Sequence, residues 1–322
     1  MKFLIAGLGS IGRRHLRNLL ALGERDIVLY RTHRSTQPDD EFAGLPVETD
    51  LSTALATGVG AVIISNPTAL HLEVAIPAAQ AGCHLLIEKP VSHSLDGIQR
   101  LQLAAKASGA RTLVGFQFRF HPGLQRIAQL LQEGAIGKPV SARAFWGEYL
   151  PGWHPWEDYR QGYSARHDLG GGVVLTLSHP IDYLHWLLGD VSQVWALTAQ
   201  SGALDLQDVE DVAEIGLRFI SGCLGSIHLD YVQRPPSHHL EIIGSSGTLC
   251  WDNASGETSL YLAEAASWEQ YPTPPGFERN HLFMAEMRHF LEVVHGDVQP
   301  ICTLEDGITA LRTCLMIIKS GT

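Results

Sequence analysis

The chain of 322 residues has no long hydrophobic run and no cluster of basic residues. A helix that crosses a membrane needs roughly 18 consecutive apolar residues, so no membrane span is expected. The 34 acidic residues outnumber the 23 basic ones and leave a net charge of −11. Without a local basic patch, such a chain has no sequence-independent attraction for nucleic acid or for an anionic membrane. The composition therefore favours a protein that binds neither.

Cysteine is scarce, and the five cysteines are scattered at positions 83, 223, 250, 302 and 314. Their spacing matches neither a disulfide framework nor a metal site, and none of the 16 histidines belongs to a recognisable set of metal ligands. The apolar run at residues 2–6 is too short for a signal peptide and is followed by no cleavage pattern. We therefore expect a cytoplasmic protein without a bound metal.

Residues 1–120 alternate short apolar runs with amphipathic stretches, which is typical of an α/β domain with a doubly wound parallel sheet. A helix is predicted over Ser94–Ser108 and another over Ile11–Leu22. The predicted strands are Lys2–Ala6, Ile27–Arg31, Ala61–Ser65, Leu85–Glu88 and Thr112–Gly115. This pattern predicts a Rossmann domain over residues 1–120.

Beyond Gly137 the strand-like runs follow one another without intervening helices, which indicates an open, mainly antiparallel sheet in an α+β domain over residues 121–322. An open sheet has an outer face to cover, so a homodimer or homotetramer is expected. The predicted strands are Val140–Tyr149, Val191–Gln200, Val212–Phe219, Gly225–Val232, His239–Gly244 and Thr248–Asp252, and the predicted closing helices are His281–His295 and Leu304–Lys319.

The segment Gly7-Leu8-Gly9-Ser10-Ile11-Gly12 follows a predicted strand and opens a predicted helix, the setting that a dinucleotide fingerprint requires. Gly7 would permit the tight turn, Gly9 would let the backbone approach the pyrophosphate, and Gly12 would let the helix pack against the strand. Backbone N–H groups at Ser10 and Ile11 would face the phosphates. An ordinary βα turn is the alternative.

The second predicted strand bears on which dinucleotide is bound. An acidic residue that binds the ribose is expected near its end, but the segment Tyr30–Ser35 contains no carboxylate. Arg31 or Arg34 would instead suit the 2′-phosphate of NADP. NADP is therefore the preferred cofactor and NAD the alternative, unless these arginines are only solvated charges.

Further motifs carry a resemblance to a known family: Asn66-Pro67-Thr68 with His71, Glu88-Lys89-Pro90, Gly115-Phe116-Gln117-Phe118-Arg119, and Gly170-Gly171-Gly172 leading to His179 and Asp182. Together with the glycine fingerprint they make the chain resemble the Gfo/Idh/MocA oxidoreductases over nearly its whole length. The resemblance implies NAD(P)-dependent oxidation or reduction of a sugar, sugar acid or inositol. The resemblance assigns cofactor contacts to Asn66, Pro67, His71, Glu88 and Arg119. Arg119 is also assigned to the substrate, and Lys89 to both the cofactor and the substrate. In the family the peptide bond before this proline is often cis.

The residues of two motifs suit this chemistry. Lys89 ends a parallel strand, where α/β sheets bind ligands, and partial burial would lower its pKa towards proton transfer; a surface lysine is the alternative. Thr176, His179 and Asp182 would share one helix face. His179 would take the proton of a substrate hydroxyl, with Asp182 or a backbone group fixing its tautomer, unless His179 and Asp182 only pack or cap.

The family pattern has an aspartate where Thr176 stands, one residue further from the histidine. Threonine can bind substrate but cannot act as a carboxylate base. The aromatic segment before it offers Tyr163 and Arg166 as substrate contacts, or else a subunit contact, and Arg119 is alternatively an ion pair between domains. Glycoside cleavage by transient NAD-dependent oxidation, and a non-catalytic sensor of dinucleotide or sugar, remain the alternative functions.

Overall fold

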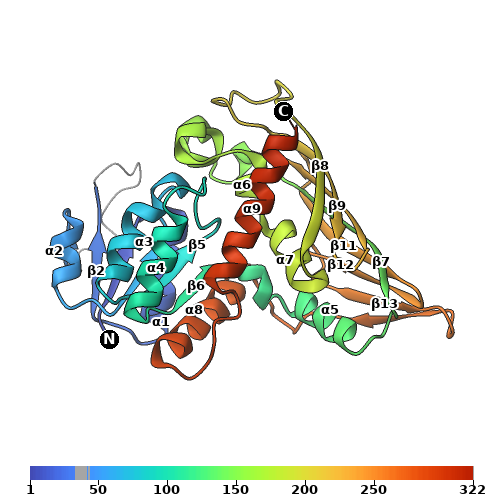
Figure 1. The fold of residues 1–322 in the computed structure, drawn as a ribbon, viewed down its shortest axis with the longest axis horizontal. Coiled ribbons are helices and arrows are strands. Elements are labelled where there is room, and N and C mark those ends of the chain that lie inside the picture. Colours follow the sequence, from blue (N-terminus) through green and yellow to red (C-terminus); the bar gives the residue numbers. More distant parts are fainter. Residues whose placement is uncertain (33–41, 43, 322) are drawn as a thin grey trace. The chain divides into compact units, whose positions relative to one another are not determined.

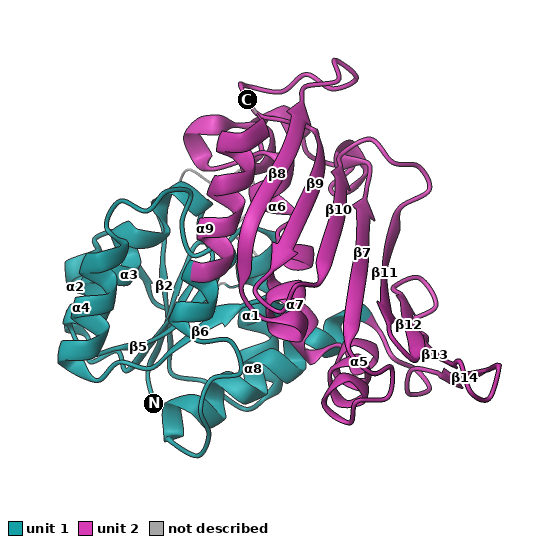
Figure 2. Ribbon diagram, turned by 45° about the vertical axis from the view of Figure 1, so that its right-hand side comes forward, with its two compact units in different colours: residues 1–117, 279–308 teal, residues 118–278, 309–322 magenta. Residues whose placement is uncertain are grey.

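The computed structural model describes every residue except 33–41, 43 and 322, and it divides into two compact units (Figures 1 and 2). Unit 1 comprises Met1–Gln117 and Arg279–Ile308, and unit 2 comprises Phe118–Glu278 and Thr309–Thr322. The sequence analysis divided the chain once, at residue 120. The structure instead groups residues 279–308 with unit 1, because helix α8 (Arg279–His295) packs against helix α1 (Ser10–Ala21).

Unit 1 is built on a six-stranded sheet in the order β3-β2-β1-β4-β5-β6, with every pair parallel. The strands are β1 (Phe3–Ala6), β2 (Ile27–Tyr30), β3 (Val47–Glu48), β4 (Ala61–Ile64), β5 (His84–Glu88) and β6 (Thr112–Gly115). The predicted doubly wound parallel sheet is confirmed. The strand order reverses between β1 and β4, and such a reversal is where open α/β sheets bind ligands, outside the carboxyl ends of the strands.

The helices of unit 1 besides α1 and α8 are α2 (Leu51–Ala56), α3 (His71–Gln80) and α4 (Ile98–Ser108), with a short 3-10 helix η2 (Thr68–Leu70) before α3. Helix α4 begins at Ile98 and not at Ser94 as predicted. Gly97 directly before it has φ +83°, a left-handed conformation that interrupts a right-handed helix.

Unit 2 is built on an eight-stranded sheet in the order β14-β13-β12-β11-β7-β10-β9-β8, and the prediction of a mainly antiparallel sheet is confirmed. Only β7 and β10 run parallel among its described pairs. Along β9 and β11 buried and more exposed residues alternate, so one face is covered and the other is open. The strands are β7 (Pro139–Gly147), β8 (Val191–Ala199), β9 (Val212–Phe219), β10 (Leu224–Asp230), β11 (Ser237–Gly244), β12 (Gly247–Asp252), β13 (Thr258–Leu262) and β14 (Ser267–Tyr271).

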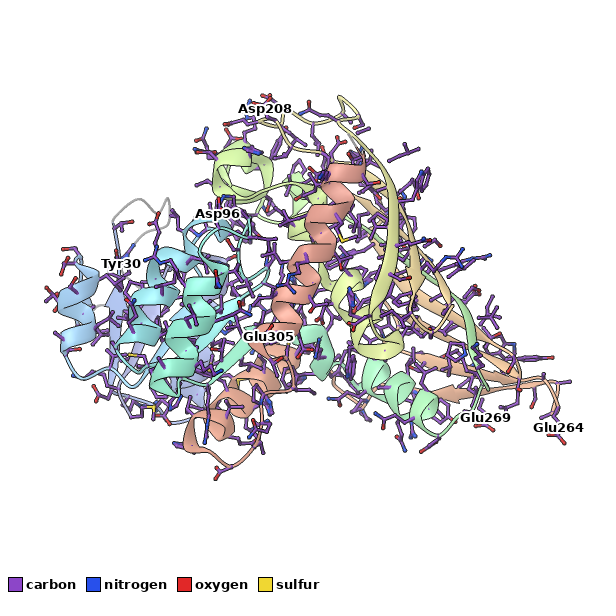
Figure 3. All side chains as sticks on the ribbon, viewed as in Figure 1. Tyr30, Asp96, Asp208, Glu264, Glu269 and Glu305 are labelled. Carbon is purple, nitrogen blue, oxygen red and sulfur yellow. The ribbon has the colours of Figure 1, made fainter. Side chains whose placement is uncertain are left out.

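The hairpin of β13 and β14, to which the sequence analysis assigned no element, ends the sheet. Figure 3 shows Glu264 at its turn and Glu269 along β14. Charged side chains on an outermost strand oppose pairing with a further strand, which suits its place at the edge of the sheet.

The helices of unit 2 pack on the covered face of the sheet (Figure 2). They are α5 (Pro122–Gln132), α6 (Val173–Thr176) and α7 (His179–Leu188), and α9 (Leu304–Gly321) begins in unit 1 and ends in unit 2. Short 3-10 helices are η3 (Gln117–Phe120), η4 (Leu150–Gly152), η5 (Tyr159–Gln161), η6 (Tyr163–Ala165) and η7 (His167–Leu169). Among the described helices, none combines the length and the apolar character needed to cross a membrane.

Helices α6 and α7 correct one expectation. Thr176, His179 and Asp182 were predicted on one helix, but Thr176 ends α6 and His179 begins α7. Pro180 stands in the first turn of α7. Proline lacks a backbone N–H and is preferred in the first turn of a helix, so Pro180 favours a helix that begins at His179 over one that continues from Thr176.

Candidate active site

The glycine loop lies at the carboxyl end of β1, beside the end of β4. Gly7 has φ +92°, and a Cβ added to it would lie 2.5 Å from the backbone nitrogen of Asn66. A Cβ on Gly12 would lie 2.0 Å from the carbonyl oxygen of Gly7. Side chains at these two positions would therefore collide with fixed backbone, whereas a Cβ on Gly9 would meet nothing within 4 Å.

The start of α1 also fits a dinucleotide. Gly9 is the residue before the helix, and no side chain caps the first N–H groups, which belong to Ser10, Ile11 and their neighbours. Uncapped N–H groups at a helix start, together with the helix dipole, bind phosphate. A further polar atom, Oδ1 of Asn66 in the neighbouring loop after β4, is buried and has no hydrogen-bond partner among the described residues. The geometry thus leaves both the space and the polar groups that a pyrophosphate requires.

The segment predicted to distinguish NADP from NAD, residues 30–35, lies only partly within the described residues. Tyr30 ends β2 (Figure 3), and the backbone N–H of Arg31 donates to the carbonyl of Glu48 at 3.0 Å. Arg31 is largely buried, with 9% of its surface exposed. Arg34, the other arginine predicted to hold a 2′-phosphate, lies outside the described residues.

His71 joins two of the predicted cofactor segments. Its ring nitrogens Nδ1 and Nε2 each lie 2.9 Å from a carbonyl oxygen, of Pro90 and Asn66 respectively. Burial lowers the pKa of His71, and a neutral ring donates to one of the two carbonyls at a time. His71 therefore braces the loop after β4, which includes Pro67, against the loop after β5.

Glu88, Lys89 and Pro90 stand at the end of β5, and the Lys89–Pro90 peptide bond is cis. His15 of α1 donates a hydrogen bond from Nε2 to Oε1 of Glu88 at 2.7 Å, and the backbone N–H of Lys89 donates to Oε2 of Glu88 at 3.2 Å. Glu88 is thereby fixed between the first helix and the residue predicted to act in catalysis. Lys89 itself is half-buried.

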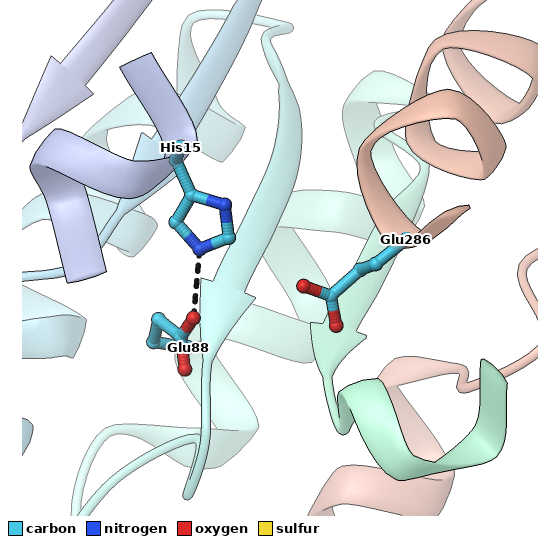
Figure 4. A group of neighbouring side chains, drawn as sticks. All are labelled: His15, Glu88 and Glu286. Carbon is cyan, nitrogen blue, oxygen red and sulfur yellow. Dashed lines mark hydrogen bonds and ion pairs between the residues drawn. The ribbon is translucent and has the colours of Figure 1, made fainter. Parts of the chain in front are cut away.

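Glu286 of α8 completes a buried cluster with His15 and Glu88 (Figure 4). The pKa of Glu88 is lowered: burial acts against this, but the hydrogen bond from His15 and the charges of His15 and Lys89 outweigh it. Burial, and after it the charge of Glu88, raises the pKa of Glu286 well above its usual range. The surroundings therefore favour the ionised form of Glu88 and the protonated form of Glu286.

The ligand atoms of these three side chains lie within 4.8 Å of one another. Among the described residues, this is the cluster of potential ligands that could hold a metal ion. No spacing rule could reveal it, because they come from α1, β5 and α8. The atoms of His15 and Glu88 that face each other are already joined in a hydrogen bond. Neither carboxyl oxygen of Glu286 has a hydrogen-bond partner among the described residues, and we call the three side chains the acid cluster.

In unit 2, Arg119 and Asp182 form a buried ion pair. Nε and Nη2 of Arg119 donate to the Asp182 carboxylate at distances of 2.8–3.2 Å, and the two side chains are only 4% and 1% exposed. Both oxygens of Asp182, expected to orient His179, are thus engaged by Arg119. The sequence analysis had weighed an ion pair for Arg119, between domains, and this one lies within unit 2.

His179 lies in a cluster of buried rings. Its centroid is 4.9 Å from that of Phe118 and 5.4 Å from that of Trp146, and His238 stacks on Trp146 at 4.3 Å. Only 1% of the His179 surface is exposed. The residue predicted to exchange a proton with substrate is therefore enclosed by aromatic side chains.

The other predicted substrate residues lie around the glycine triplet of residues 170–172. The N–H of Gly172 donates to the carbonyl of Ser164, the neighbour of Tyr163, at 3.0 Å. Arg166 donates two hydrogen bonds to Asp168, so its guanidinium is already paired. Thr176 is 2% exposed, and its side chain lies beside the hydroxyl of Tyr231, which donates to the carbonyl of Ser164 at 3.3 Å.

Comparisons with known proteins agree with this arrangement. Residues 1–116 match the family model "Oxidoreductase family, NAD-binding Rossmann fold", and residues 124–250 match "GFO/IDH/MocA C-terminal domain". The chain is 30% identical to 1,5-anhydro-D-fructose reductase of Ensifer adhaerens over 270 residues, 82% of this chain and 78% of that protein. It is 26% identical to myo-inositol 2-dehydrogenase of Thermotoga maritima over 330 residues, 97% of this chain and 93% of that protein.

Among solved structures, levoglucosan dehydrogenase in complex with NADH and levoglucosan has the same fold. It superposes with a TM-score of 0.88 at 20% identity, over 100% of this chain and 97% of the other.

Proposed function

Because the chain belongs to the Gfo/Idh/MocA family of oxidoreductases, we propose that it transfers a hydride between NAD(P)(H) and a secondary alcohol or ketone of a sugar, sugar acid or inositol. The observation that carries the proposal is the glycine loop, which admits only glycine at positions 7 and 12 and leaves open space at Gly9. The same unit presents Lys89 at the end of β5.

The nicotinamide would supply the hydride acceptor or donor, and the protein would manage the accompanying proton. Lys89 and His179 would bind the reacting oxygen and manage the proton of its hydroxyl group. The names of similar proteins support this substrate class: one reduces an anhydrofructose and another oxidises an inositol. The free state of all five cysteines, which lie within the described residues, suits a reducing cytoplasm.

NADP is the cofactor we propose, with NAD as the alternative. The end of β2 carries Arg31 in place of an acidic residue, and an arginine suits a 2′-phosphate. Michaelis constants for the two cofactors test this: a lower constant for NADP is expected, and a lower one for NAD would contradict it.

The proposed function is tested by following absorbance at 340 nm while NADP and NAD are each offered with sugars, sugar acids and inositols. Lys89→Ala is expected to lower kcat by about 10²–10⁴-fold. Lys106→Ala, which changes an exposed lysine of α4, is the matched control. Absence of turnover with cofactor binding intact would favour the sensor, and a cofactor retained through purification would favour glycoside cleavage.

A further inference from the structure

The carboxylate of Glu88 is fixed by partners that all belong to unit 1 (Figure 4). Its oxygen Oε1 accepts a hydrogen bond from Nε2 of His15 at 2.7 Å, and Oε2 accepts one from the backbone N–H of Lys89 at 3.2 Å. Glu88 is 8% exposed and His15 is fully buried. Both oxygens of Glu88 therefore serve contacts inside the protein, and one of these contacts is with Lys89.

The ring of His15 is itself held in place. It packs edge-on against Phe283 of α8, with ring centroids 6.1 Å apart and an interplanar angle of 70°. Its other nitrogen, Nδ1, is buried and has no hydrogen-bond partner among the described residues. A neutral imidazole has one donor and one acceptor nitrogen, so a proton on Nε2 leaves no buried N–H unsatisfied. His15 thus presents one donor to Glu88 in a fixed direction.

Strand β6 leaves room for this carboxylate. Gly115 stands opposite Glu88 in the register of β5 and β6. A Cβ on Gly115 would lie 3.3 Å from both Cδ and Oε2 of Glu88, which is tighter than ordinary van der Waals contact. The absence of a side chain at position 115 therefore keeps open the space that the carboxylate occupies.

Glu88 also carries the negative charge of the acid cluster. Burial acts to raise the pKa of Glu88, but the hydrogen bond from His15 and the charges of His15 and Lys89 outweigh it. Burial, and after it the charge of Glu88, raises the pKa of Glu286, which favours the protonated form of that neighbour. A buried carboxylate attracts a nearby ammonium group more strongly than it would in water. The charge of Glu88 therefore acts on the side chain of Lys89 as well as on its backbone.

These contacts end at the residue on which the proposed function depends, and the inference rests on that function. We propose that His15 and Glu88 are positioning residues for Lys89: the carboxylate that His15 holds in place fixes the backbone of Lys89 and attracts its ammonium group. A displacement of about 1 Å at a reacting group lowers a rate by about 10²-fold. The place of Lys89 therefore matters for hydride transfer, although neither positioning residue takes part in the chemistry.

The link between Glu88 and Lys89 is tested first without turnover, by brief treatment with acetic anhydride at neutral pH and peptide mass spectrometry. Glu88→Gln keeps the size of the side chain but removes the charge that favours the ammonium form of Lys89. Because only an unprotonated amine reacts, Lys89 is expected to be acetylated about two- to fivefold faster than in wild type, the change that a half-exposed ion pair supports. Lys106, an exposed lysine of α4, is expected to react equally in both proteins.

Turnover of a polyol tests the consequence for the reaction. Glu88→Gln is expected to lower kcat by about 10²-fold. In the Lys89→Ala background the same substitution is expected to change kcat no further, because a residue that acts through Lys89 then has nothing left to position. A separate structural or cofactor-binding role of Glu88 would lower kcat in both backgrounds.

Two substitutions of His15 keep the test independent of the folding of Glu88→Gln. His15→Gln retains a nitrogen donor, and His15→Leu retains bulk without a donor. His15→Leu is expected to lower kcat more than His15→Gln does, and neither is expected to lower it further in the Lys89→Ala background. Glu73→Gln, which changes an exposed carboxylate of α3, is the matched control and is expected to keep the wild-type kcat.

Equal acetylation of Lys89 in Glu88→Gln and wild type, or effects of Glu88→Gln and Lys89→Ala that multiply, would overturn the positioning role while leaving the dehydrogenase intact. A wild-type enzyme that turns over no member of the panel would overturn the proposed function. The acetylation of Lys89 would in that case still decide whether Glu88 acts on it.

Discussion

At the scale of single residues, substitutions at Gly12 and Gly9 distinguish an effect on folding from an effect on cofactor binding. A Cβ on Gly12 meets the backbone of Gly7, which cannot move aside as a side chain can. Gly12→Ala is therefore expected to destabilise the protein by about 1–3 kcal/mol, measured by urea unfolding. Gly9 has φ −70° and open space around its Cβ position, so Gly9→Ala should leave stability unchanged.

The same Gly9→Ala variant is expected to weaken NAD(P)H binding by about tenfold or more, because its methyl group would occupy the approach of the pyrophosphate to backbone N–H groups. Fluorescence titration with the reduced cofactor measures this. Equal cofactor affinity in Gly9→Ala and wild type would show that the dinucleotide does not use this loop.

The role of a residue could be predicted from the sequence when its contacts come from neighbouring residues in the chain, and not when they come from distant segments. The glycine loop is a continuous segment, so its turn, open position and close contact follow from the order of residues. Glu286 meets His15 and Glu88 only through the fold, and no spacing in the sequence marks it. For Asp182 the ion pair with Arg119 could not be derived, because the two residues stand 63 positions apart.

At the scale of elements, the sequence contains a signal for the boundary between α6 and α7, but the sequence analysis predicted a single helix there. The periodicity of Thr176, His179 and Asp182 favoured one helix, but Pro180 favours a helix that begins at His179. The strands were predicted more closely, and Val212–Phe219 and Thr112–Gly115 are confirmed at both ends. The alternation of apolar and polar residues marks β9, and a short apolar run that ends in glycine marks β6. The short helix α6 is instead held by contacts with the segment before β9.

The contact of α1, β5 and α8 through the acid cluster predicts a pH-dependent stability. Because the fold raises the pKa of Glu286, the folded state keeps a proton that the unfolded chain loses above about pH 4.3. Stability should therefore fall as the pH rises above that value, until Glu286 ionises in the folded state. Glu286→Gln removes this ionisation.

The measurement is the free energy of unfolding in urea from pH 5 to pH 8 for both proteins. The stability of Glu286→Gln relative to wild type is expected to increase steadily with pH. Glu73→Gln, which changes an exposed carboxylate of α3 in the same unit, should give a curve parallel to wild type. Parallel curves for Glu286→Gln as well would mean that Glu286 is ionised in the folded protein.

At the scale of the whole molecule, hydrophobic periodicity was enough to predict two sheets of different kinds. Fully buried four-residue strands such as β1 and β4 belong to a sheet covered on both faces, and alternating strands such as β9 belong to one that is open on one side. The return of residues 279–308 to unit 1 could not be predicted, because an amphipathic helix such as α8 does not specify which sheet its apolar face will cover.

The open face of the eight-stranded sheet supports the expectation of a homodimer or homotetramer. It exposes 59% of Trp195, 59% of Leu197 and 50% of Leu224, and beside them Phe145 stacks on His228 with ring centroids 4.4 Å apart. Large apolar side chains gathered on one face favour association.

Light scattering at micromolar concentration is therefore expected to give the mass of two or four chains, and the double variant Trp195→Glu with Leu197→Glu to give a smaller assembly, because two charges would have to be buried. Leu103→Glu, which alters a side chain of α4 that is 60% exposed, should keep the wild-type mass. A wild-type mass of one chain would mean that water alone covers this face.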